Sequence, residues 1–260
     1  MKLAISGKGG VGKTTVAALL SAALRSAGHD VIAIDADPDA NLLAAMGYPA
    51  RDSVSPLVEL KDIIEERTGV KPGTVGGMFK LNPRVDDLPE KYAVDVEGVK
   101  VLVAGAVKKG GSGCYCPENS LVRTLIAHVL LDEDTSLVLD MEAGVEHLSR
   151  GTTQAVDALI VVVEPGRRSI ETAERILRLA GDLGLRQVVA VGNKVRSAED
   201  EELIQSGIGD IPLAVFVPYD HAIRDAEIGE RSVVGASHTA GVAVAKLVDI
   251  LENQSLAEKH

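Results

Sequence analysis

The chain has 260 residues, of which 46% are hydrophobic, so it is long enough to bury one sizeable core. Its formal net charge of −11 argues against nucleic-acid binding, which depends on clustered lysines and arginines. Two cysteines are too few for the disulfide framework of a small secreted protein, and no apolar run has the roughly 18 residues of a membrane span. We therefore expect a single domain, residues 1–260, in the cytoplasm, without a signal peptide, membrane span or nucleic-acid partner.

Short apolar runs alternate with segments of helical period along the chain. Runs rich in Val, Ile and Leu predict strands at 3–6, 31–35, 99–104, 136–140, 158–163, 187–192 and 213–217. Helical periodicity predicts helices at 14–27, 57–68, 118–131, 170–183 and 199–205, and a last helix near 239–251. This alternation is typical of an α/β fold with a doubly wound, mostly parallel sheet flanked by helices. Turn residues at about 69–98 predict an insertion between the second and third core strands.

A glycine-rich phosphate-binding sequence follows the first predicted strand. The run G-K-G-G-V-G-K-T fits G-x-x-x-x-G-K-S/T and lies between a strand and a helix, a context that argues against a plain glycine-rich turn. Glycines let backbone N–H groups surround phosphates, Lys13 reaches the β and γ phosphates, and Thr14 ligates Mg²⁺. The predicted ATP-binding residues of this segment are Gly7, Lys8, Gly9, Gly10, Val11, Gly12, Lys13, Thr14 and Thr15.

Lys8 is a second lysine within this loop, and cradling phosphate within one chain does not require it. The arrangement resembles the deviant Walker A superfamily, which includes MinD, ParA and the nitrogenase iron protein. The resemblance implies that Lys8 crosses a dimer interface to the partner's phosphates, where a cation stabilises the transferring phosphoryl group. Lys8 and Lys13 are accordingly expected to be catalytic, and the chain to be an ATPase; a solvated loop lysine is the alternative for Lys8.

An acidic segment follows the second predicted strand. Residues 35–41, D-A-D-P-D-A-N, resemble switch I of the same superfamily. The resemblance implies that Asp37 orients or deprotonates the attacking water and that Asp35 and Asn41 hold metal-bound waters. A strand end followed by an Asx-rich turn is the alternative, because Asp, Pro and Asn favour such turns.

The fourth core strand ends at Asp140, which fits the carboxylate that holds the hydration shell of Mg²⁺. Gly144 lies just beyond and could offer its N–H to the γ-phosphate, then move when that phosphate leaves. His147 is expected to be a structural histidine, with nickel ligation as the alternative. Glu142 and Glu146 are expected to be polar residues of this switch.

The sequence Asn193-Lys194-Val195-Arg196 is predicted to follow the sixth strand, and it favours adenine over guanine. Guanine recognition by N-K-x-D requires an acceptor where Arg196 stands, and arginine only donates. By resemblance Asn193 contacts the base, Lys194 belongs to the same nucleotide site, and the turn at Pro218-Tyr219 lies close to it.

Both cysteines occur in one predicted loop at about 105–119, as Cys114 and Cys116. A C-x-C pair supplies two thiolates, whereas a tetrahedral Zn²⁺, Ni²⁺ or Cu⁺ site usually takes four ligands. A two-fold symmetric dimer would bring four thiolates to its axis and could couple nucleotide state to metal affinity. Reduced surface thiols, a C-x-C disulfide and a structural zinc clip are the alternatives.

The flanks of the cysteines carry a more specific resemblance. The strings K-K-G-G-S-G-C-Y-C-P-E-N, D-M-E-A-G-V-E-H-L-S-R-G-T, A-G-D-L-G and N-K-V-R together resemble the CooC-type nickel-insertion ATPases of carbon monoxide dehydrogenase maturation. The likeness covers nearly the whole chain and is weakest at 69–98 and beyond about 232. It implies a homodimer that binds Ni²⁺ or Zn²⁺ through Cys114 and Cys116 and links ATP hydrolysis to nickel loading.

Three other functions remain open at this point. A similar relative serves acetyl-CoA synthase, and the sequence does not separate the two client enzymes. An iron-protein-like reductase is disfavoured because His147 stands where that pattern has its bridging cysteine. A MinD or ParA positioning role would call for a membrane-binding tail or a basic DNA face, and residues 249–260 have no wide apolar stripe.

Overall fold

A computed structural model describes residues 1–72, 78–105, 116–142, 144, 148, 153–185 and 187–257. Its strands are β1 (Lys2–Gly7), β2 (Val31–Ala36), β3 (Val94–Val96), β4 (Val99–Val103), β5 (Ser136–Met141), β6 (Ala158–Val163), β7 (Val188–Val195) and β8 (Leu213–Pro218). Its α-helices are α1 (Lys13–Ser26), α2 (Leu42–Ala45), α3 (Lys61–Thr68), α4 (Leu88–Tyr92), α5 (Pro117–Leu131), α6 (Arg167–Leu183), α7 (Ala198–Gly207), α8 (His221–Ile228) and α9 (His238–Ala257).

The strands form one sheet in the order β3-β4-β2-β5-β1-β6-β7-β8, which is parallel except that β3 runs antiparallel to β4. Strand β1 lies between β5 and β6, so the loop after β1 emerges in the middle of the sheet. After β1 the chain continues to β2, which lies on one side of β1 in the sheet, and it later forms β6, which lies on the other side of β1. Ligands of such sheets bind at this crossover, beyond the carboxyl ends of the strands.

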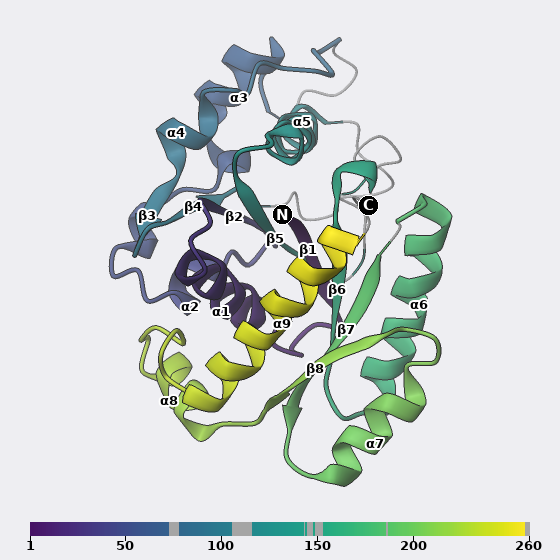
Figure 1. Cartoon of the computed structure of the whole chain (residues 1–260). Helices are drawn as coiled ribbons and strands as arrows, with labels where there is room; N and C mark the ends of the chain where they lie inside the picture. The colour runs from purple at the N-terminus through teal and green to yellow at the C-terminus, as the bar shows by residue number, and fades with distance from the viewer. Residues whose placement is uncertain are drawn as a thin grey trace.

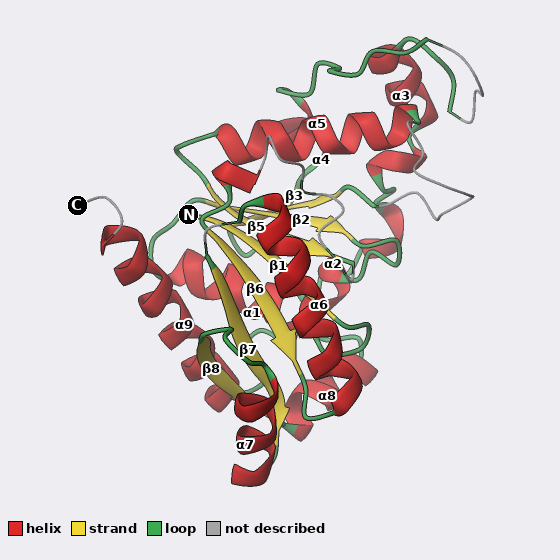
Figure 2. Ribbon diagram, turned by 90° about the vertical axis from the view of Figure 1, so that its right-hand side faces the viewer, coloured by secondary structure: helices red, strands yellow, loops and turns green. Residues whose placement is uncertain are grey.

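Helices cover both faces of the sheet, as Figure 2 shows with α9 and α6 on opposite sides. Every residue of β1, β2, β5 and β6 is buried, because side chains on both pleat faces meet helices. Leu137 and Leu139 face the cluster under α5 and α6, whereas Leu3 and Ile5 face the cluster under α1 and α9. The doubly wound α/β fold expected from the sequence is thereby confirmed.

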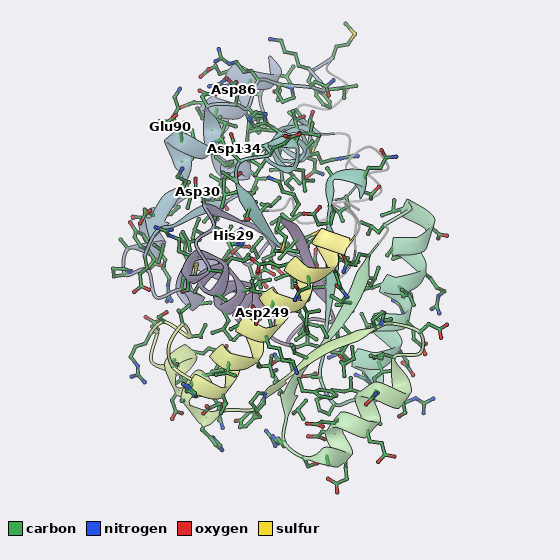
Figure 3. All side chains as sticks on the ribbon, in the orientation of Figure 1. His29, Asp30, Asp86, Glu90, Asp134 and Asp249 are labelled. Atoms are coloured by element: carbon green, nitrogen blue, oxygen red, sulfur yellow. The ribbon has the colours of Figure 1, made fainter. Side chains whose placement is uncertain are left out.

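The yellow C-terminal helix α9 crosses the strands on one face in Figure 1 and packs against α1 and β8. His29, labelled in Figure 3, ties this helix to the amino-terminal edge of the sheet. Its two ring nitrogens lie 2.8 Å from Ser136 Oγ and 2.8 Å from Glu252 Oε1. Within the described part of the chain, no helix has the length and apolar character needed to traverse a membrane.

Several predicted boundaries differ from the structure. The expected insertion at 69–98 contains α4 and ends in β3, an edge strand that weak periodicity concealed. A two-residue turn at Glu97 and Gly98, both with positive φ, joins β3 to β4, which is the turn geometry that tight hairpins prefer. The expected helix at 57–68 divides into a 3₁₀ turn (Leu57–Glu59) and α3, and the short helices α2 and α8 had not been predicted.

Candidate nucleotide site

The loop between β1 and α1 has the geometry that phosphate binding requires. Gly10 and Gly12 have φ values of 82° and 93°, which L side chains rarely adopt. A Cβ atom on Gly12 would also collide with the amide of Asn193. Gly12 is the N-cap of α1 without a side-chain cap, so the first N–H groups of that helix stay available for an anion.

Lys13 is the first residue of α1, and only 7% of it is exposed. The strand, loop and helix context predicted for the phosphate-binding sequence is therefore present. Neighbouring Thr15 donates a hydrogen bond of 2.8 Å from Oγ1 to Glu227 Oε1 on α8. Glu227 is one of the site residues that sequence reasoning missed, since it lies 212 positions away in the chain.

Two buried carboxylates lie side by side on adjacent strands, and one of them, Asp140, contacts the first turn of α1. Asp35 on β2 and Asp140 on β5 are direct register partners, and neither is exposed to solvent. Burial, together with the charge of the nearby Asp35, raises the pKa of Asp140 to about 7. Burial likewise raises the pKa of Asp35 to about 6, although N–H groups of Leu42 and Asp37 oppose this.

Asp140 and Thr14 fit a Mg²⁺ ion. Thr14 Oγ1 donates to Asp140 Oδ2 at 2.7 Å, while the buried Asp140 Oδ1 has no hydrogen-bond partner among the described residues. A buried carboxylate oxygen without a partner is costly unless a cation or its water completes the site. Hard oxygen donors are also the ligands that Mg²⁺ prefers, so these two side chains could hold the ion.

Asp35 shapes the segment predicted to be switch I. Its Oδ1 accepts from Asp37 N at 3.1 Å and its Oδ2 accepts from Leu42 N at 2.8 Å. Asp37 is half-buried and accepts from Asp39 N at 2.9 Å, and Asn41 is exposed at the N-cap of α2. The segment therefore does form the Asx turns that were the alternative to switch I, and these turns do not exclude a role in hydrolysis. The roles of Asp37 and Asn41 in hydrolysis stay predictions.

Gly144 is a described residue of the segment after β5 that is predicted to move when the γ-phosphate leaves. Ser6, at the carboxyl end of β1, donates from Oγ to Gly144 O at 2.7 Å and accepts from Gly144 N at 3.1 Å. The N–H expected to meet a γ-phosphate is therefore bonded within the chain. Glu142 is exposed, and Glu146 and His147 lie outside the described residues.

The predicted base-binding segment is part of a strand and does not follow it: β7 continues to Val195, with a bulge between Asn193 and Val195. Asn193 is 6% exposed and donates from Nδ2 to Val11 O at 2.7 Å. Lys194, with φ of 59°, donates from Nζ to Gly10 O at 2.5 Å. Both residues thus brace the phosphate loop, and contact of Asn193 with the base stays a prediction.

An aromatic group lies next to this segment. The guanidinium of Arg196 lies 4.1 Å from the ring centre of Tyr219, which follows Pro218 at the end of β8. The Tyr219 ring meets His221 edge-on at 5.1 Å between centroids. Arg196 had been considered only as a residue that excludes guanine, and its stacking depends on β7 and β8 being neighbours.

The side chain of Lys8 lies beside the phosphate loop of its own chain and is 36% exposed. Its Nζ is 3.5 Å from Gly9 O and 3.9 Å from Glu164 Oε1. Glu164, which follows β6, was also missed by sequence reasoning. Its position directly after a predicted apolar strand, at the carboxyl end where ligands of such sheets bind, is the signal that could have identified it.

Cys116 is the half-buried N-cap of α5, directly before Pro117. Cys114 and the rest of 106–115 lie outside the described residues. Within the ranges that the structure describes, no three His, Cys, Asp or Glu side chains are grouped to hold a metal ion. The predicted Ni²⁺ or Zn²⁺ site at Cys114 and Cys116 stays a prediction.

Comparison with known proteins connects this geometry to a family. The profile of the CobQ/CobB/MinD/ParA nucleotide-binding domain matches residues 2–233. The chain is 47% identical over 229 residues to the carbon monoxide dehydrogenase accessory protein CooC of Rhodospirillum rubrum, and the match covers 87% of each chain. It is 44% identical over 230 residues to an uncharacterized ATP-binding protein of Methanocaldococcus jannaschii, covering 87% and 88%.

Among solved structures, the septum site-determining protein MinD complexed with Mg-ADP from Pyrococcus horikoshii superposes with a TM-score of 0.68. That match covers 98% of this chain and 96% of the MinD chain, at 22% sequence identity. At such low identity the superposition establishes the fold alone.

Proposed function

Because this chain belongs to the CobQ/CobB/MinD/ParA nucleotide-binding family and is a CooC-like ATPase that binds ATP or ADP with Mg²⁺, we propose that it acts as a nucleotide-switched homodimer. In this proposal the dimer binds Ni²⁺ or Zn²⁺ through paired C-x-C motifs and assists nickel insertion into carbon monoxide dehydrogenase. The observation that carries the proposal is 47% identity to a carbon monoxide dehydrogenase accessory protein over 87% of both chains. Cys114 and Cys116 supply the thiolates that such a role requires.

In this proposal, different residues around the loop have different roles in ATP hydrolysis. The N–H groups at the start of α1 and the Lys13 ammonium bind the phosphates, and Thr14 and Asp140 hold Mg²⁺. Mg²⁺ supplies positive charge that offsets the charge on the phosphate oxygens. Asp37 orients the attacking water, and Lys8 of one subunit reaches the phosphates bound by the other.

The cysteines give the dimer its second ligand. One C-x-C pair leaves a tetrahedral metal two ligands short, whereas two pairs related by a two-fold axis complete it. The metal is thus cargo whose site exists only when the subunits meet. Binding of ATP favours dimerisation, and hydrolysis favours dissociation of the dimer. Metal release is then timed by the nucleotide.

The proposal includes a cytoplasmic location and no nucleic-acid or membrane partner, in keeping with the net charge of −11. Carbon monoxide dehydrogenase is the proposed client, and acetyl-CoA synthase is the alternative client. Positioning ATPases are more distant in sequence: the chain is 25% identical to the septum site-determining protein MinD of Bacillus subtilis. The higher identity to the accessory protein favours metal-centre maturation.

The Cys114→Ser variant tests this function. Wild-type dimer should bind one Ni²⁺ or Zn²⁺ and activate nickel-free carbon monoxide dehydrogenase when nickel and ATP are supplied. The variant should lose stoichiometric metal binding and activation, because one thiolate per chain cannot complete a tetrahedral site. Metal analysis of the gel-filtered dimer gives the stoichiometry.

Tyr115→Phe is the matched control, since it changes the residue between the cysteines and keeps both thiols. Nucleotide affinity should be the same in all three proteins. A Cys114→Ser dimer that still holds one metal ion tightly would contradict the site assignment. Failure of the wild type to activate the dehydrogenase would contradict the client assignment.

A further inference from the structure

Glu164 occupies a fixed position beside the phosphate loop. It follows β6, the strand next to β1, and precedes the first turn of α6. Its backbone N–H donates to Ser169 Oγ at 3.1 Å, so the start of α6 holds the residue in place. Its side chain is 27% exposed, so it is partly buried and partly in contact with solvent.

The Glu164 carboxylate lies between two lysine ammonium groups. Oε2 is 3.3 Å from Lys194 Nζ, and Oε1 is 3.9 Å from Lys8 Nζ. A carboxylate between two cations attracts both, and the pair with the longer distance is the weaker one. Lys8 is therefore the more easily released of the two partners.

Lys194 is held by more than this carboxylate. It lies at the bulge of β7 with φ of 59°, a conformation that a non-glycine residue keeps only when its surroundings enforce it. Its Nζ also donates to Gly10 O at 2.5 Å. Glu164 thus keeps a cationic neighbour after Lys8 leaves, which lowers the cost of releasing Lys8.

We propose that Glu164 is a positioning residue that retains Lys8 over its own loop in the separate subunit, and that this ion pair must break before Lys8 can reach the partner's phosphates. The inference rests on the proposed trans role of Lys8 and describes its regulation. Glu164 thereby sets how readily the nucleotide-bound subunits close. Without the Glu164 contact, Lys8 would be free to reach across the dimer interface, and the dimer would form at a lower protein concentration.

The size of the effect follows from the exposure of the pair. Ion pairs between partly exposed groups change an equilibrium by about 1.4- to 5-fold. A symmetric dimer breaks two such pairs, so their factors multiply. Removing the Glu164 charge should therefore lower the dimer dissociation constant by about 2- to 30-fold.

The test compares Glu164→Gln with Glu171→Gln by sedimentation, over a range of protein concentrations with a non-hydrolysable ATP analogue and Mg²⁺. Both variants remove one negative charge per subunit, but Glu171 pairs with Arg167 on α6, at 3.0 Å. Only Glu164→Gln should tighten the dimer beyond the effect of reduced charge repulsion. Its affinity for the analogue under dilute, monomeric conditions should equal that of the wild type.

The same pair of variants in a Lys8→Ala background separates the possible failures. In that background Glu164→Gln should change the dimer dissociation constant no more than Glu171→Gln does, because Lys8, the partner that the substitution would release, is missing. A dissociation constant equal to that of Glu171→Gln, an equal tightening without Lys8, or weaker analogue binding by the monomer would each overturn the role of Glu164 alone. A wild-type protein that stays monomeric with the analogue would overturn the proposed function itself.

Discussion

At the residue scale, Lys8 is the side chain on which the trans mechanism depends. Replacing it with alanine should lower ATP turnover by about 10³-fold or more, the usual effect of removing a cation supplied by a second subunit. Nucleotide binding should be largely unchanged, because in the proposed mechanism Lys13 and the start of α1 bind the phosphates. Steady-state hydrolysis and equilibrium binding of a fluorescent ATP analogue measure the two properties.

Arg168→Ala is a suitable control for Lys8→Ala, since Arg168 is an exposed cation on α6 and its loss changes the net charge equally. That control should hydrolyse ATP at the wild-type rate. Turnover by Lys8→Ala at the rate of the control would remove the trans lysine from the mechanism.

The two buried carboxylates make the stability of the nucleotide-free protein depend on pH. The pKa of Asp140 is raised to about 7 and that of Asp35 to about 6 in the folded chain, against an unfolded value near 3.9. Folding therefore favours the protonated acids, and the stability that they contribute is present below about pH 4 and is lost as pH rises through about 6 to 7. The affinity for Mg²⁺ should instead increase as pH rises, because the ion would compete with the proton on Asp140.

Urea unfolding of the nucleotide-free wild type between pH 5 and 8 should show this loss. Asp140→Asn, which keeps an acceptor for the Thr14 hydroxyl, should have a flatter profile and be the more stable protein at pH 8. Equal pH dependence of the wild type and Asp140→Asn would show that the carboxyl ionises freely in the folded chain.

At the scale of a secondary-structure element, helix α5 carries Cys116 at its start and packs on the sheet through one face. Leu130 is 4% exposed and belongs to the core, whereas the adjacent Leu131 is 72% exposed. Leu130→Ala should lower the free energy of unfolding by about 2–5 kcal/mol, because it removes buried methyl groups and leaves a cavity. Leu131→Ala is the matched control and should change it by less than about 0.5 kcal/mol.

Urea unfolding of the two variants measures the difference. If both variants lost a similar amount of stability, α5 would not pack against the sheet through the face that contains Leu130. The comparison matters for function because α5 fixes where Cys116 emerges.

At the scale of the whole molecule, metal and nucleotide should influence each other if both bind the same closed dimer. A non-hydrolysable ATP analogue should raise the affinity for Zn²⁺, and Zn²⁺ should raise the affinity for the analogue by the same factor, about 5- to 150-fold. Isothermal titrations of each ligand, with and without the other, measure the two factors. Cys114→Ser should bind the analogue with no response to Zn²⁺, and an absence of coupling in the wild type would contradict a shared dimer.

The fold class and the phosphate loop could be predicted from the amino-acid sequence. Both depend on local patterns: buried runs and helical periods identify the βα alternation, and the glycine spacing before Lys13 has few other uses. The edge strand β3 was missed although its hairpin turn at Glu97 and Gly98 is also local, because the run between 94 and 96 is too short to show a period.

Which residues meet at the site could not be predicted in the same way, because it depends on the packing of distant segments. Asp35 and Asp140 become neighbours only because β2 and β5 pair, and Glu164 meets Lys8 only because β6 lies next to β1. Ser6 and Gly144 are 138 positions apart in the chain, and Thr15 and Glu227 are 212 apart. The order of strands in the sheet creates these contacts, and no local spacing encodes that order, because it results from how all the helices and strands share two buried faces.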